Sequence, residues 1–96
     1  MTKAAMPYPK GDLRRMLSVL SAIDSAAGAT VAQVSTVTGL SRQTVTDLIH
    51  SAAQQAGVRI RKSGSTYQIV DWGPVIRKAG AVLALSGELE GRAIEE

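Results

Sequence analysis

The sequence predicts an α+β domain that is mainly helical, with three helices, a two-stranded β-hairpin and a further C-terminal helix. Three observations lead to this prediction. The chain has 96 residues, which suits one small domain. Apolar residues recur at steps of three and four up to Gly57, and beyond Gly57 they alternate with polar residues. We expect a flexible arm over 1–10, the single domain over 11–91 and an acidic tail over 92–96.

The composition limits the core and the chemistry. The chain has no Phe, one Trp and two Tyr, so aliphatic side chains must build the core. The absence of Cys excludes disulfides, thiolate metal sites and cysteine nucleophiles. A lone histidine, His50, cannot form a metal cage, and we expect no metal and no cofactor. We see neither a signal peptide nor an apolar run of membrane-spanning length, and therefore expect a cytoplasmic protein with no membrane partner.

The charge is unevenly distributed. The net charge is +3, but the segment from Ser86 to Glu96 has four glutamates against one arginine and carries −3, which leaves +6 on the rest of the chain. A basic body with an acidic tail is compatible with a polyanionic partner.

The first helix is predicted over about 13–27. Asp12 is placed to cap it and Gly28 to stop it. Its apolar stripe consists of Leu13, Met16, Leu17, Leu20 and Ile23. Ahead of this helix, Pro7 and Pro9 indicate the flexible arm.

A second helix is predicted over about 31–38, between a Thr30 cap and Gly39. Its three valines, Val31, Val34 and Val37, lie three residues apart and do not alternate as in a half-buried strand. This spacing favours a helix, although β-branched residues are mediocre helix formers.

A third helix is predicted from the cap Ser41 to Gly57, which has the usual place of a left-handed terminal residue. Its apolar positions are Val45, Leu48, Ile49, Ala52 and Ala56. The hairpin follows over 58–70 with its turn at 63–65, and its alternation predicts an apolar face toward the helices and a basic face outward.

The last helix is predicted over 74–90, because Pro74 suits a first helical turn. Its apolar residues cover more than one face. We interpret this as a second buried surface and expect a homodimer through this helix. The expected interface residues are Val75, Ile76, Ala79, Val82 and Leu83. We interpret Tyr67 and Trp72 as packing anchors in preference to base-stacking residues.

One segment carries a resemblance to a known family. The stretch VSTVTGLSRQTVTDL, from Val34 to Leu48, resembles the helix-turn-helix of bacterial repressors, including the lactose-repressor family. The matching positions are Ser35, Gly39, Leu40, Ser41, Thr44, Val45 and Leu48. The order of helices and hairpin resembles that of a winged helix-turn-helix domain.

The resemblance implies a DNA-contact surface. The residues left exposed at the start of the third helix include Asp47, and they would enter the major groove of double-stranded DNA. The base contacts implied are those of Arg42, Gln43, Thr46 and His50. The phosphate contacts implied are those of Ser41 and Thr44 at the helix start and of Arg59, Arg61 and Lys62 on the hairpin.

The function expected is sequence-specific binding of double-stranded DNA by a small prokaryotic, plasmid or phage transcription regulator acting as a homodimer. The alternative is a winged-helix module for protein interaction that makes no DNA contact. An enzyme is not expected, because no nucleophile, base and orienting group occur in a workable pattern. Any small-molecule effector is unknown from the sequence.

Overall fold

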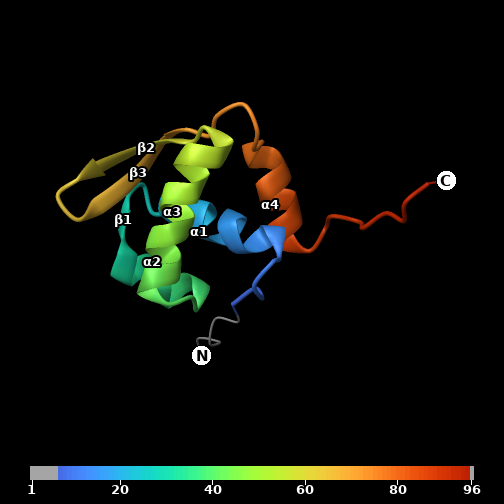
Figure 1. Cartoon of the computed structure of the whole chain (residues 1–96), viewed down its shortest axis with the longest axis horizontal. Coiled ribbons are helices and arrows are strands. Elements are labelled where there is room, and N and C mark those ends of the chain that lie inside the picture. Colours follow the sequence, from blue (N-terminus) through green and yellow to red (C-terminus); the bar gives the residue numbers. More distant parts are fainter. Residues whose placement is uncertain (1–6, 96) are drawn as a thin grey trace.

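Four helices and a three-stranded antiparallel sheet make up residues 7–95, the part of the chain that the computed structural model describes (Figure 1). The predicted class, α+β and mainly helical, is confirmed. The elements in order are α1 (Leu13–Ser25), β1 (Ala29–Thr30), α2 (Val31–Thr38), α3 (Arg42–Ala56), β2 (Arg59–Ser63), β3 (Thr66–Asp71) and α4 (Lys78–Ser86). The predicted arm over 1–10 falls mostly on residues 1–6, outside the described residues.

The helix α1 begins where its cap predicts. An Asp12 side-chain oxygen accepts a hydrogen bond of 2.9 Å from the Arg14 amide, which satisfies one of the free donors at the helix start. The helix ends at Ser25, two residues before the predicted end, because Ala27 and Gly28 turn into the left-handed region with φ of 53° and 120°.

A third strand, β1, was not predicted. Its two residues pair antiparallel with β3, Ala29 opposite Tyr67 and Thr30 opposite Thr66, so that the sheet order is β1-β3-β2. Two residues are too few to show an alternating pattern. Thr30 also caps α2 as predicted, because its side chain and that of Gln33 form a reciprocal capping box.

The hairpin pairs β2 with β3 around a turn that contains Gly64 at φ 61°. Ile60 lies opposite Ile69 and Lys62 opposite Tyr67, so these four residues share one face of the hairpin. Ile60, Tyr67 and Ile69 on that face pack against the buried core. The predicted apolar inner face is therefore present.

The helix α4 is shorter than predicted: it runs from Lys78 to Ser86 and not over 74–90. Pro74 does not start it. Asp71 accepts a 2.7 Å hydrogen bond from the Gly73 amide, and Gly73 has φ of 82°, so the chain turns before Pro74. At the other end Gly87, with φ of 84°, closes the helix.

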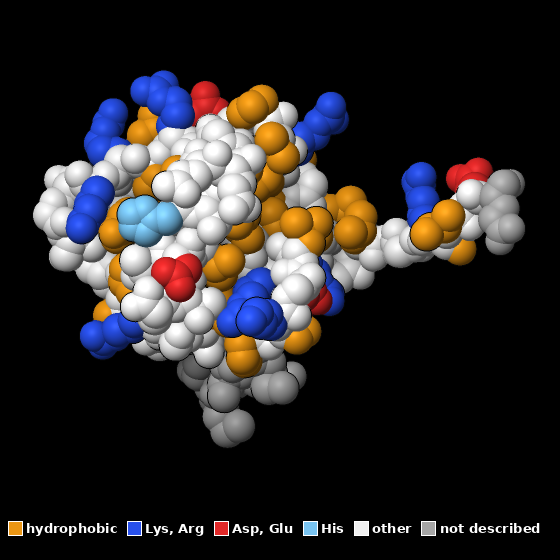
Figure 2. All heavy atoms as spheres, in the orientation of Figure 1, with side chains coloured by type: hydrophobic (Ala, Val, Ile, Leu, Met, Phe, Trp, Pro, Cys, Tyr) orange, Lys and Arg blue, Asp and Glu red, His pale blue; other side chains and the backbone are white. Residues whose placement is uncertain are grey.

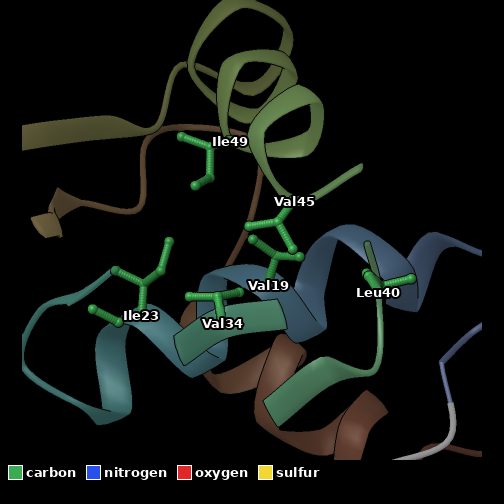
Figure 3. Close-up of a cluster of buried hydrophobic side chains, with 7 residues drawn as sticks. Val19, Ile23, Val34, Leu40, Val45 and Ile49 are labelled. Atoms are coloured by element: carbon green, nitrogen blue, oxygen red, sulfur yellow. The ribbon is translucent and has the colours of Figure 1, made fainter. Parts of the chain in front are cut away.

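The helices and the sheet enclose a continuous aliphatic core. In Figure 3, Val45 and Ile49 of α3 point toward Val19 and Ile23 of α1, with Val34 of α2 nearby. A second group joins Leu20, Ala52, Ala56 and Val58, and a third packs Ala81 and Ala84 of α4 on Leu17. Half-buried Trp72 packs against both of these groups, which confirms the interpretation of Trp72 as a packing anchor.

Packing around this core determines where the hairpin and α4 lie relative to α3. In Figure 1, α3 crosses in front of α1, the hairpin extends to one side of α3, and α4 lies on the other side. One long face of α3 is therefore left without a covering element. Within residues 7–95, no helix is both long and apolar enough to cross a membrane.

Candidate nucleic-acid interface

The turn between α2 and α3 is held by side-chain hydrogen bonds as well as by glycine. Gly39 has φ of 77°, and its amide donates to the Ser35 carbonyl at 2.9 Å. The Ser35 hydroxyl donates to the Leu40 carbonyl at 2.7 Å, and the Thr38 hydroxyl donates to the Val34 carbonyl at 2.7 Å. The Ser35 bond, together with a 3.3 Å bond from the Leu40 amide to the Thr38 hydroxyl, joins the end of α2 to the chain entering α3. The turn therefore fixes the direction in which α3 leaves α2.

The burial of one side of α3 decides which side chains face outward. Val45 and Ile49 are 0% and 3% exposed against the core. With 3.6 residues per turn, the opposite face carries Gln43, Asp47 and His50, and all three are exposed. Arg42 lies nearer the buried side but is exposed because it is the first residue of α3. Thr46 is half-buried, and its hydroxyl donates to the Arg42 carbonyl at 3.0 Å. Thr46 can therefore offer a ligand its methyl group and the two lone pairs of its hydroxyl oxygen.

Asp47 holds the side chain of Gln43. The Gln43 amide nitrogen donates to an Asp47 carboxylate oxygen at 2.9 Å, one helical turn away. This contact was not predicted. It fixes the orientation of the Gln43 amide, so that its carbonyl oxygen and its second N–H remain for other partners.

The start of α3 offers donors suited to an anion. The Ser41 oxygen accepts from the Thr44 amide at 3.2 Å, and the Ser41 hydroxyl donates to the Thr44 oxygen at 2.9 Å. The Thr44 hydroxyl proton is therefore not used in this pair and is free to donate. The first amides of a helix also lack intrahelical acceptors and carry partial positive charge.

The three cations of the hairpin do not lie on one face. Arg61 lies opposite Gln68 on the outer face, whereas Lys62 lies opposite Tyr67, with its Nζ 5.4 Å from the centre of the ring. The Tyr67 ring attracts this ammonium group and holds it beside the inner face. The outward basic face predicted from the alternation therefore includes Arg61 but does not extend to Lys62. The three cations are all exposed and lie along one strand, with Arg59 at its start.

The ion pairs found among the described residues lie outside α3 and the hairpin. Lys78 pairs with Asp24 at 2.9 Å, and Arg14 pairs with Asp12 at 2.7 Å. Side-chain hydrogen bonding from Arg14 lowers the pKa of Asp12. Arg42 and the hairpin cations are therefore not engaged by carboxylates within residues 7–95. Figure 2 shows Lys and Arg side chains along one edge of the face that carries the pale-blue histidine and one acidic side chain.

The expected dimer residues divide between the surface and the core. Val75 is 66% exposed, Val82 is 55% exposed, and Ala79 and Leu83 are also exposed. Ile76 instead is half-buried and packs against two core groups of its own chain. The buried face of α4 is formed by Ala81 and Ala84, whose small side chains allow close approach to α1. The outer side of α4 is thus apolar and uncovered.

Within the described residues, no three metal-binding side chains cluster together. Comparisons with protein-family models, with characterised proteins and with solved structures give no match to this chain. The function must therefore be argued from the chain's own geometry and charge.

Proposed function

We propose that this protein binds double-stranded DNA through α3 and the β2–β3 hairpin, as a winged helix-turn-helix transcription regulator of a prokaryote, plasmid or phage. One observation carries the proposal. The helix α3 presents Arg42 at its exposed first turn and Gln43 and His50 on its uncovered face, beside a hairpin with three exposed cations, and none of these cations forms an ion pair within residues 7–95. The order of the elements, in which the β2–β3 hairpin directly follows α3, also supports the proposal.

The contacts divide into base reading and phosphate binding. Arg42 can donate two hydrogen bonds to a guanine edge, and Gln43 can use its free carbonyl oxygen and second N–H on an adenine edge. Thr46 and His50 lie further along the same side, where a methyl group and an imidazole reach flanking bases. Ser41, Thr44 and the hairpin cations Arg59, Arg61 and Lys62 hold phosphates and set the register.

A homodimer formed through α4 completes the proposal. Val82, Leu83 and Ala79 form an apolar surface next to the segment that carries Val75, and covering it with a second copy removes this surface from water. Two-fold symmetry then presents two copies of α3 to an inverted repeat.

Selection of bound fragments from a random duplex library, carried out at two salt concentrations, tests this function. An enriched inverted repeat, bound more weakly at the higher salt, is the expected result. The absence of enrichment at both salt concentrations would refute DNA recognition.

The exposed apolar side of α4 favours a second candidate, a module that binds another protein. Its binding would rest on apolar burial and change little with salt, whereas phosphate contacts weaken steeply as salt rises. The salt arm of the selection separates the two candidates.

A further inference from the structure

A groove of about 860 Å³ lies between the start of α1, one side of α3 and the segment before α4. Its walls are partly apolar: Met16 and Leu48 are half-buried in it, and Leu13 and Val75 at its edge are 74% and 66% exposed. Figure 2 shows hydrophobic side chains running down the middle of this face and ending near a group of Lys and Arg side chains. Exposed aliphatic groups gathered around a hollow are typical of a ligand site.

The groove also contains a cation whose hydrogen bonds are incomplete. Arg15 lines it, and the Arg15 Nε is buried without a hydrogen-bond partner among the described residues. A buried donor of a charged group that is left unpaired destabilises the protein unless a ligand or water satisfies it. Lys10 also lines the groove and adds a second positive charge.

The acidic residues on the groove wall are already engaged. Asp12 forms an ion pair with Arg14, which does not line the groove, and Asp47 accepts from Gln43. Neither carboxylate is within ion-pair distance of Arg15. The groove wall therefore carries the guanidinium of Arg15, which forms no ion pair within residues 7–95, and the ammonium group of Lys10, against the carboxylate of Asp47, whose charge the neutral Gln43 amide does not cancel.

We propose that this groove binds a small organic carboxylate with an aliphatic body. The guanidinium of Arg15 is planar, and its two terminal nitrogens, which form no ion pair within residues 7–95, can donate two parallel hydrogen bonds to a carboxylate. The aliphatic body lies against Leu13, Met16 and Leu48, where its burial is favourable.

The position of the groove connects it to DNA. Thr44 and Asp47 line the groove and also belong to the first part of α3. There, the Thr44 hydroxyl is the donor proposed to bind a phosphate, and Asp47 orients the Gln43 amide. A ligand that touches these side chains changes the affinity of α3 for DNA, and DNA changes the affinity for the ligand by the same factor. This coupling rests on the proposed DNA-binding function, whereas carboxylate binding does not.

Titration of the isotope-labelled chain with octanoate, followed by amide NMR shifts in the absence of DNA, tests the binding site. Shifts are expected at residues 13–16 and 44–48, with 1-octanol, which lacks the charge, binding about tenfold more weakly. The Arg15→Gln variant is expected to weaken octanoate binding about tenfold and to leave 1-octanol binding unchanged. Arg15→Lys should restore part of the loss.

Arg77→Gln is the matched control, because Arg77 is exposed, forms no ion pair within residues 7–95 and lies outside the groove wall. It should keep octanoate affinity within about twofold, and the dispersion of each variant's NMR spectrum verifies its fold. Equal binding of octanoate and 1-octanol, equal loss in both arginine variants, or the absence of any octanoate-induced shift would overturn the site.

A second titration with a duplex obtained by selection tests the coupling alone. A change in duplex affinity on adding octanoate, absent in Arg15→Gln, is expected. Octanoate binding without that change would overturn the coupling and leave the site standing, and failure to select any duplex would overturn the DNA function while leaving the first titration valid.

Discussion

At the scale of single residues, the close contact between two backbone segments shapes the fold as much as side-chain chemistry does. A Cβ on Gly73 would lie 2.5 Å from the Gly57 carbonyl oxygen, and Gly73 also has φ of 82°. Gly73 therefore allows the chain after β3 to pass directly over the end of α3. Glycine is the residue that meets both demands, because it has no Cβ.

Gly73→Ala is therefore expected to destabilise the protein by more than about 3 kcal/mol, since the clash is with backbone that cannot move aside. Gly64→Ala is the control: Gly64 has φ of 61° but open space around it, so only the left-handed strain of about 1 kcal/mol remains. Urea denaturation of both variants measures the difference. Equal destabilisation would show that contact with Gly57 is unimportant.

The hydrogen bond from Gln43 to Asp47 gives this acidic residue a role on a surface that is otherwise suited to binding an anion: Asp47 orients the Gln43 amide. Asp47→Ala should raise affinity for random duplex, because a negative charge near phosphates is removed. It should also reduce discrimination at the base pair that Gln43 contacts, because the amide is then free to rotate. Binding of selected and scrambled duplexes measures both effects. A variant with higher affinity and unchanged discrimination would contradict the positioning role.

At the scale of elements, helix signals predicted α1, α2 and α3 closely, because each has an oxygen-bearing cap at its start and a residue of left-handed φ shortly after its end. The start of α4 was missed, because Pro74 fits both a first helical turn and a loop, and the deciding contact is between Gly73 and Gly57. Strand β1 was missed because its pairing with β3 joins residues about forty positions apart. Long-range contacts of this kind leave little signal in local periodicity.

The capping bond of α1 predicts a dependence of stability on pH. Hydrogen bonding to Arg14 lowers the pKa of Asp12 below its ordinary value of 3.8, so the charged carboxylate is favoured in the folded chain. The resulting stabilisation is present above that ordinary value and is lost as the pH falls through the lowered pKa. Asp12→Asn keeps a capping oxygen but does not titrate. Urea denaturation at about pH 6 and about pH 3 should show the difference between the two proteins shrinking in acid, and a constant difference would contradict it.

The outer surface of α4 predicts an effect of charge on assembly. Val82→Glu should convert a dimer into a monomer, because a carboxylate in an apolar interface is desolvated without a partner. Val37→Glu is the control, since Val37 is 63% exposed but belongs to α2. Analytical ultracentrifugation at micromolar concentration measures the mass. A monomeric parent protein, or equal dissociation by both substitutions, would contradict a dimer formed through α4.

At the scale of the whole molecule, the arrangement of charge could be predicted only in part. The exposure of Gln43, Asp47 and His50 on α3 followed from its periodicity, because Val45 and Ile49 had to face the core. The division of Arg61 and Lys62 between two faces of the hairpin follows from the alternation of side chains along a strand. The groove at Arg15 instead depends on how α1, α3 and the loop before α4 meet, and this tertiary arrangement leaves no local signal.

The central claim is that α3 reads bases while the hairpin binds phosphates. Its most direct test measures the affinity of Arg42→Ala and Arg61→Ala for a selected duplex and for each single base-pair change in it, at several salt concentrations. We expect Arg42→Ala to lose preference at one base pair, and Arg61→Ala to weaken every duplex alike and to reduce the salt slope by about one. Equal loss of base preference in both variants would contradict the claim.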